Sequence, residues 1–378
     1  MGLIIKLIVA IVVGIALGGF SPEVIVRLAI TVKALLGELI VFIIPLIIFF
    51  FIASGISKLR HKGGKMLSVT LGLAYASSVV AGLLGLSFAL FLAPELIVGG
   101  AIDLTDNVKF SPFFSIDMPP LASVMTVLVL AFLFGIGIAT TDSDVLQQGV
   151  DQGRHIIELT IMRVVIPLLP FYVTGIFAEI AATGAALETL KVFGFVLVLA
   201  VIVHWLWLLI LYFIAGSIAH QNPLRALKTM LPAYITALGT MSSAATIPVT
   251  LQQAQKNRVS FDVAHFSIPL CATIHLCGSI ITIVTCAVAV MLLTDNLMTP
   301  SLATMFPFIL MAAIILVAAP GVPGGAIIAI LGLLESMLGF DSNALALMIA
   351  LYLAQDAFGT ACNVTGDGAL ALMVDRIR

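Results

Sequence analysis

The sequence predicts an all-α polytopic membrane protein with eight transmembrane helices and two re-entrant helical hairpins. Its 378 residues are 61% hydrophobic and only 10% charged, with a mean hydropathy of +1.23, which is far from the composition of a soluble domain. Apolar runs long enough to cross a bilayer recur along the chain. The formal net charge of −2 gives no indication of a nucleic-acid partner, so the expected surroundings are the lipid bilayer.

Eight apolar segments are expected to be transmembrane helices. They cover residues 3–20, 31–57, 66–97, 121–140, 156–182, 192–218, 264–293 and 343–374. Several are longer than a perpendicular helix needs, which indicates tilt. The first resembles a signal peptide, but Lys6 follows apolar residues and no clear A-x-A site comes after it. We therefore expect this segment to be retained as the first helix.

Two further segments, 229–255 and 306–338, are apolar at both ends and interrupted in the middle. The interruptions read "TMSSAATIP" and "APGVPGG". Such a pattern is typical of a helix–turn–helix that enters the membrane and returns on the same side. Non-helical backbone is tolerated at membrane depth only where protein or a cavity covers it.

The two hairpins belong to an apparent repeat. Ser243 in the first tip precedes His275 by 32 residues, and Pro323 in the second tip precedes Asp356 by 33. Each hairpin is thus followed by a span with a polar centre. Because the first hairpin opens from the inside and the second from the outside, the halves are inverted. This arrangement is typical of secondary transporters, whose binding site lies where the halves meet.

The basic residues predict that both termini are cytoplasmic. With the N-terminus inside, only Arg27, Lys33, Lys109 and Lys191 fall outside, and Arg163 lies within a span. The remaining 12 of the 17 Lys and Arg residues are on the inner side, in agreement with the positive-inside rule. The four cysteines all lie in apolar spans, which favours buried thiols over a disulfide framework.

The stretch "DAFGTACNVTGDGA" places polar residues in the middle of the last span. On a helix, Asp356, Thr360, Asn363 and Asp367 fall within a stripe about 60° wide. A charge at mid-bilayer costs at least about 2.5 kcal/mol, so two aspartates need a positive partner. That partner is a bound cation, a substrate ammonium or a proton. The alternative is a protonated, hydrogen-bonded carboxyl pair that joins helices.

Four motifs make the chain resemble the dicarboxylate/amino acid:cation symporter family, which includes the glutamate transporter homologues. They read "TMSSAATIPVTL", "PLCATIHLCGSI", "GVPGGAI" and "DAFGTACNVTGD". The resemblance covers most of the chain and is strongest from Thr229 onward. It implies a symporter rather than an enzyme, working by an elevator mechanism as a homotrimer in the cell (inner) membrane. Residues 229–378 would form the transport domain and 1–228 mainly the scaffold, with the third span shared.

The resemblance also implies a binding site for an amino acid. Asp356 matches the aspartate that holds the substrate α-ammonium. Thr360 and Asn363 match groups that contact substrate, with the Asn363 amide holding the α-carboxylate. Ser242 and Ser243 belong to the first hairpin tip, where hydroxyls and free backbone N–H groups favour a carboxylate.

The second hairpin tip and one substitution complete the substrate site that the resemblance implies. Gly321, Val322, Pro323 and Gly324 match the second tip, the expected outer gate. Gly359 stands where members that carry acidic substrates have an arginine. Without a guanidinium, a second substrate carboxylate would be buried without a partner. A small neutral amino acid such as alanine, serine, threonine or cysteine is therefore expected.

The coupling ion implied by the resemblance is Na⁺. Asp367 and Asn363 match one sodium site, because carboxylate and carbonyl oxygens suit a hard cation. Ser78, with its neighbour in the third span, matches part of another site. His275 and Cys277, however, replace an asparagine and an aspartate of the family motif, so we expect an incomplete sodium set. Because histidine titrates near neutrality, a proton-coupled amino acid or dicarboxylate symporter is the alternative, and a structural role for His275 stays open.

An intramembrane aspartyl protease and a channel are remote alternatives. An intramembrane aspartyl protease needs two facing carboxylates. Asp356 and Asp367 are about 16 Å apart along one helix, which is too far. A channel is disfavoured because paired hairpins indicate alternating access.

Overall fold

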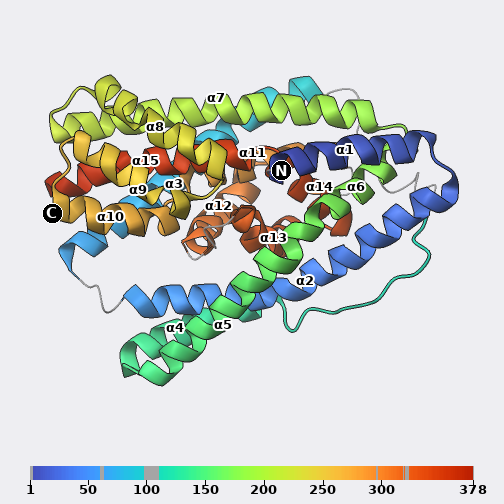
Figure 1. The fold of residues 1–378 in the computed structure, drawn as a ribbon, viewed down its shortest axis with the longest axis horizontal. Helices are drawn as coiled ribbons and strands as arrows, with labels where there is room; N and C mark the ends of the chain where they lie inside the picture. Colours follow the sequence, from blue (N-terminus) through green and yellow to red (C-terminus); the bar gives the residue numbers. More distant parts are fainter. Residues whose placement is uncertain are drawn as a thin grey trace.

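The computed structural model describes residues 3–59, 64–97, 110–294, 297–317, 319 and 323–377, which contain helices but no strand (Figure 1). This confirms the predicted all-α class. The helices are α1 (Leu3–Phe20), α2 (Glu23–Leu59), α3 (Lys65–Ile97), α4 (Val124–Thr141), α5 (Asp144–Thr160), the π-helical turn η2 (Ile161–Val165), α6 (Ile166–Ala182), α7 (Ala186–Ala219), α8 (Pro223–Thr240), α9 (Ser243–Lys256), α10 (Phe261–Ile274), α11 (Cys277–Leu293), α12 (Leu302–Leu316), α13 (Gly325–Leu338), α14 (Ser342–Leu353) and α15 (Asp356–Ile377).

The helices α1, α2, α4, α5 and α6 form a first group. α2 packs against α4, α5 and α6, and α1 packs along α6. α5, η2 and α6 follow one another without a gap, so this helix begins at residue 144 rather than at the predicted 156. Its first part is amphipathic and buries Val150 and Ile157. A search for uninterrupted apolar runs does not detect such a segment.

A second group contains α3, α7 and the helices from α8 onward. α15 packs against α7, α8, α10 and α11, and α11 packs along α3. Figure 1 shows α7 along the top of the molecule, with α8 and α15 beneath it. The α10–α11 segment lies at the centre, since 94% of its most apolar stretch is buried. α7 lies in the range 1–228 that was predicted to be mainly scaffold, and it packs against α15, α8, α11 and α3.

Both interrupted segments form helix–turn–helix units. α8 packs against α9, and α12 packs against α13. In the first unit the turn occurs at Met241, whose φ is 52°, and Ser242 caps the following helix by accepting a hydrogen bond from the Ala245 N–H at 3.3 Å. In the second unit Gly324 has a φ of 74°, a conformation that glycine adopts without a Cβ penalty.

Two spans that were predicted as continuous are broken. Residues His275 and Leu276 are not helical and separate α10 from α11. The last predicted span bends by 60° between α14 and α15, at residues 354–355. Both breaks leave helix ends, with their unpaired backbone groups, in the interior of the protein.

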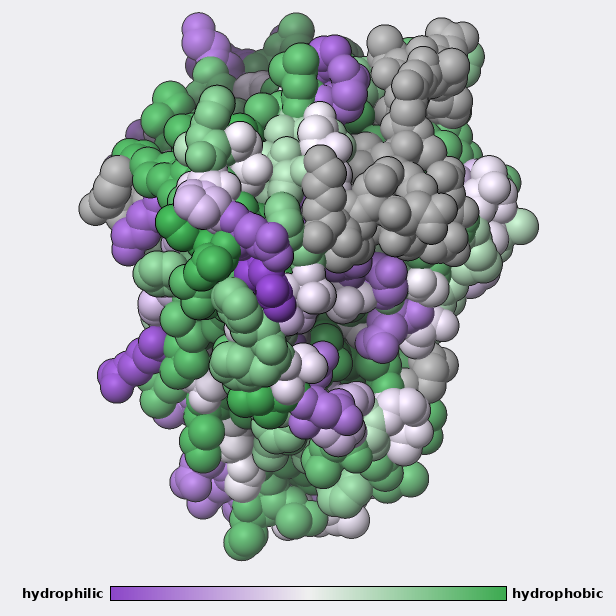
Figure 2. Space-filling model, turned by 90° about the vertical axis from the view of Figure 1, so that its right-hand side faces the viewer, coloured by the Kyte–Doolittle hydropathy of each residue, from purple (hydrophilic) through white to green (hydrophobic). Residues whose placement is uncertain are grey.

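The surface and the helix lengths fit a multi-pass membrane protein. Among the described residues, five helical segments are long and apolar enough to cross a membrane, and the bent α14–α15 pair would be a sixth. The predicted spans 3–20 and 121–140 correspond to shorter apolar helices. Figure 2 shows one face of the molecule on which hydrophobic and hydrophilic patches are mixed. Val12 on α1 and Leu133 on α4 are exposed apolar side chains of these shorter helices. The total of eight spans stays a prediction.

A buried ion pair within the first group of helices is joined to the second group by a hydrogen bond. Lys33 on α2 contacts Glu179 on α6, and its Nζ also donates to the Asn343 Oδ1 on α14 at 2.7 Å. The two charged side chains are only 10% and 18% exposed. We expect Glu179→Ala to lower the free energy of unfolding by about 3 kcal/mol, because it leaves a buried cation with one neutral partner. Thermal unfolding of the purified protein measures this.

The matched control is the pair of Glu188 and Lys191 on α7, whose side chains are 61% and 60% exposed. Glu188→Ala should change the unfolding temperature very little, because solvent screens an exposed pair. Equal effects of the two substitutions would contradict a structural role for the buried pair.

Candidate functional site

A polar cavity lies where the two hairpins meet the two broken helices. It is lined by Met241, Ser243, Ala272, Thr273, Leu276, Ser279, Ala319, Ala326, Tyr352, Asp356, Thr360 and Asn363. The lining comes from the first tip, the α10–α11 break, the start of α13, the end of α14 and the start of α15. Asp356 is the one charged residue in this lining.

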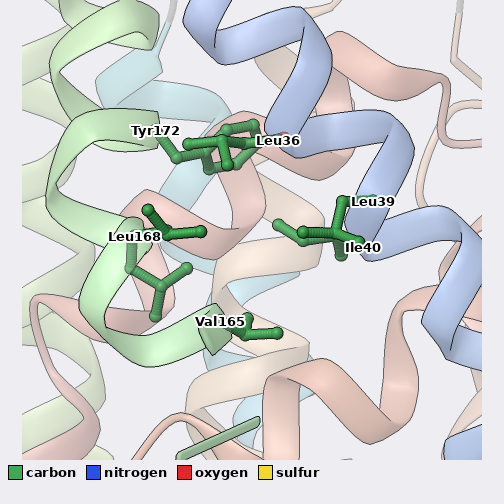
Figure 3. A pocket seen from close by; sticks show the side chains of 7 residues that line it. Leu36, Leu39, Ile40, Val165, Leu168 and Tyr172 are labelled. Atoms are coloured by element: carbon green, nitrogen blue, oxygen red, sulfur yellow. The ribbon is translucent and has the colours of Figure 1, made fainter. Parts of the chain in front are cut away.

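A second cavity between α2 and the η2–α6 segment differs in chemistry. Figure 3 shows that it is lined by aliphatic side chains and one tyrosine: Leu36, Leu39, Ile40, Val165, Leu168, Leu169 and Tyr172. It offers no charge to an ammonium or a carboxylate group. The polar cavity is therefore the candidate site for a zwitterion.

Asp356 is held in place by the second hairpin. The carboxylate is buried, and its Oδ2 accepts a hydrogen bond from the backbone N–H of Gly324 at 2.7 Å. The helix break places Asp356 in the first turn of α15, where its side chain reaches the cavity. A buried carboxylate with no cationic neighbour in the lining attracts a positively charged ligand group.

Asn363 joins α15 to the start of α11. Its Oδ1 accepts hydrogen bonds from the backbone N–H groups of Gly278 at 2.7 Å and Ser279 at 3.2 Å. Its Nδ2 donates to the Ser279 hydroxyl at 2.9 Å. These bonds satisfy two of the free N–H groups at the start of α11 and fix the amide in one orientation. One amide hydrogen is left for a ligand.

Asp367 lies in a second cluster, apart from the cavity lining. Its Oδ1 is 2.9 Å from the Nδ1 of His275, and the Nε2 of His275 is 2.8 Å from the Ser77 hydroxyl on α3. All three side chains are buried. Ser77 makes this contact, and its neighbour Ser78, the predicted cation ligand, is also buried. The imidazole thus contacts one oxygen of Asp367, the carboxylate that was predicted to bind sodium.

Oxygen ligands for a cation remain near this cluster. α10 ends at Ile274, so its last carbonyl groups lack partners within the helix and present the negative end of the helix dipole. Carbonyl oxygens at such breaks suit Na⁺, which needs no cluster of histidine, cysteine or acidic residues. In the described part of the chain, no group of three such residues could hold a metal ion.

Gly366 lets α15 approach this cluster closely. A Cβ at this position would lie 2.9 Å from Cε1 of His275 and 3.1 Å from Sγ of Cys277. We expect Gly366→Ala to lower the free energy of unfolding by about 1–3 kcal/mol, because neither buried neighbour has room to move. The control is Gly194→Ala on α7, where a Cβ meets nothing within 4 Å. The control should be neutral or slightly stabilising, and a loss equal to that of Gly366→Ala would contradict this packing argument.

The predicted substrate residues are only partly brought together. Ser243, Asp356, Thr360 and Asn363 line the cavity, whereas Gly324 reaches it through its backbone bond to Asp356. This much of the predicted site is found in one place.

Other predicted residues take different places. Ser242 caps α9, the half-buried Pro323 is not part of the lining, and Val322 lies outside the described residues. Gly359 does not line the cavity, contrary to expectation. A Cβ there would point at α11, 3.3 Å from the Thr282 hydroxyl oxygen. Gly359 is close to Asp356 around the helix, but it faces α11 because α11 packs against α15 at this point.

Three polar lining residues, Thr273, Ser279 and Tyr352, were not among the predicted site residues. Ser279 follows the α10–α11 break, and no proline or glycine at residues 275–276 marks that break. Tyr352 stands just before the bend that begins α15. A polar side chain four residues before a membrane-embedded aspartate is the available signal.

Comparisons with known proteins agree with the motifs. The model of the sodium:dicarboxylate symporter family matches residues 3–377. The chain is 28% identical over 403 residues to the serine/threonine transporter SstT of Acinetobacter baumannii strain AYE, covering 99% of this chain and 96% of the relative. The same protein of strains AB307-0294 and AB0057 matches with the same identity and coverage.

Proposed function

Because the chain belongs to the sodium:dicarboxylate symporter family, whose members are transporters and not enzymes, we propose that it is a Na⁺-coupled symporter of a small neutral amino acid. The observation that carries this proposal is the cavity with one buried carboxylate, Asp356, and no cationic side chain in its lining. Serine and threonine are the proposed substrates, because the relatives are serine/threonine transporters.

The charges of the cavity account for this choice. The substrate ammonium binds Asp356, and the substrate carboxylate binds the Asn363 amide and the first hairpin tip at Ser243. The tip begins α9, so its backbone N–H groups favour an anion. An aspartate or glutamate substrate would bring a second carboxylate into a site without a guanidinium or ammonium group. Burial of an unpaired charge disfavours such substrates.

The proposed mechanism uses the hairpins as gates. Both hairpins are re-entrant, and the second closes over the substrate through the bond between Gly324 and Asp356. Residues 229–378, together with α3 and α7, then move as the transport domain against the other helices, which form the scaffold. The protein is an elevator-type homotrimer in the inner membrane of the cell, with eight spans and both termini cytoplasmic.

The contact between His275 and Asp367 favours one second candidate, proton coupling. A neutral imidazole that donates from Nδ1 to the carboxylate accepts from Ser77 at Nε2, and a proton added to either group would carry charge through the membrane. Under sodium coupling, Asp367, Asn363 and the free carbonyls of α10 provide the ligands instead. In that case the dependence of uptake on sodium concentration should have a Hill coefficient lower than a carrier that couples to three sodium ions would show.

A thermal-shift screen tests the proposed function. Serine and threonine should raise the unfolding temperature of the purified protein when Na⁺ is present, and aspartate should not, because ligands stabilise the state that they bind. Stabilisation by aspartate alone would contradict the neutral-substrate proposal.

A further inference from the structure

Tyr352 lies beside the proposed ammonium site. It belongs to the last turn of α14, immediately before the 60° bend that begins α15 at Asp356. The side chain is fully buried, and it lines the same cavity as Asp356 and Thr360. The bend therefore turns the tyrosine and the aspartate toward one space.

The hydroxyl of Tyr352 has no hydrogen-bond partner in the part of the chain that the structure describes. Asp356 and Ser279 are the polar side chains that interact with it, and a small shift of the phenol toward either of them would form a hydrogen bond. Each of these neighbours has another partner. Asp356 accepts from the Gly324 N–H, and the Ser279 hydroxyl accepts from Asn363.

A buried polar atom without a partner needs an explanation, because most such atoms in folded proteins are hydrogen bonded. The cavity supplies the explanation here. A ligand group that enters it with a hydrogen-bonding oxygen satisfies the phenol. No other atom of the cavity-lining side chains is both buried and unpartnered.

We propose that Tyr352 determines specificity by hydrogen bonding to the side-chain hydroxyl of a β-hydroxy amino acid. The assignment rests on the proposed function, which places the ammonium at Asp356. In serine and threonine the ammonium nitrogen and the hydroxyl oxygen are three bonds apart, so a group beside Asp356 reaches that hydroxyl. Alanine would leave the phenol unpaired, and a site built to bind a hydroxyl discriminates against a ligand without one.

The variant Tyr352→Phe tests this assignment. Inhibition of labelled serine uptake by unlabelled serine, threonine and alanine is measured in proteoliposomes. We expect the apparent affinity for serine and threonine to fall by about 10-fold, while that for alanine stays unchanged. The control is Tyr212→Phe, which removes a buried hydroxyl that donates to the Thr365 carbonyl at 2.8 Å, outside the cavity. It should leave the serine-to-alanine ratio unchanged.

Three outcomes would overturn the assignment. An equal loss for all three substrates in Tyr352→Phe would mean that the phenol only positions Asp356. Unchanged apparent affinities for all three substrates would mean that the phenol does not contact the hydroxyl. If the variant does not fold, the native protein still decides, since it must prefer serine over alanine and threonine over 2-aminobutyrate by about 10-fold. Failure of the proposed function looks different, because the native protein would then take up no amino acid at all.

Discussion

Asp356→Asn is expected to abolish amino acid uptake, while the protein still folds and inserts into the membrane. The substitution removes the one anion in the cavity lining, so a buried substrate ammonium loses its counter-charge. Breaking a buried ion pair costs about 3–5 kcal/mol, which corresponds to a loss in affinity of at least about 100-fold. Uptake of labelled serine at subsaturating concentration measures this.

Asparagine is the informative replacement because its amide oxygen can still accept the bond from the Gly324 N–H. The second hairpin therefore keeps its contact with α15, and only the charge changes. Asp262→Asn, at an exposed position in the first turn of α10, is the control and should transport normally. Uptake by Asp356→Asn near the native level would show that the ammonium binds elsewhere.

Asp367→Ala is expected to remove transport together with its dependence on the coupling ion. The side chain is 1% exposed and faces His275 and the end of α10, so its charge serves either a sodium ion or the imidazole. In both cases the substrate cavity itself keeps Asp356. Substrate binding measured by thermal shift should therefore persist more than uptake does, but it should no longer respond to the ion.

His275→Asn separates the two coupling ions. Under sodium coupling this variant should keep a sodium-dependent uptake with little change in its pH profile. Under proton coupling the pH profile should change, because the one titratable ring in the cluster is gone.

For the Asp367→Ala variant, uptake that still rises with sodium would refute the role of Asp367 in coupling.

Four polar residues of the candidate site could be predicted because they stand out against an apolar background. They occur in segments at membrane depth that would otherwise be apolar. The structure places all four around one cavity: Ser243, Asp356, Thr360 and Asn363. The helical stripe was also correct as geometry. However, the residues of the stripe lie in two different sites. Asp356, Thr360 and Asn363 line the cavity, whereas Asp367 contacts His275 outside the lining.

The remaining features of the site depend on tertiary packing, which no local sequence pattern indicates. The breaks at 275–276 and 354–355 occur in segments that contain no glycine or proline at those positions. Gly359 is only about 60° from Asp356 around α15, yet the close approach of α11 determines what it faces. Which of the neighbouring Ser77 and Ser78 meets His275 depends on the rotation of α3, which the nearly uniform hydrophobicity of that helix does not specify.

Uptake of labelled serine into proteoliposomes that carry a single ion gradient tests the central proposal most directly. With an inward sodium gradient and equal pH on both sides, the account predicts accumulation of serine above the external concentration, and unlabelled aspartate should not compete. The Asp356→Asn protein should show none of this uptake. Accumulation driven by a pH gradient in the absence of sodium, with no response to a sodium gradient, would contradict the sodium-coupled account.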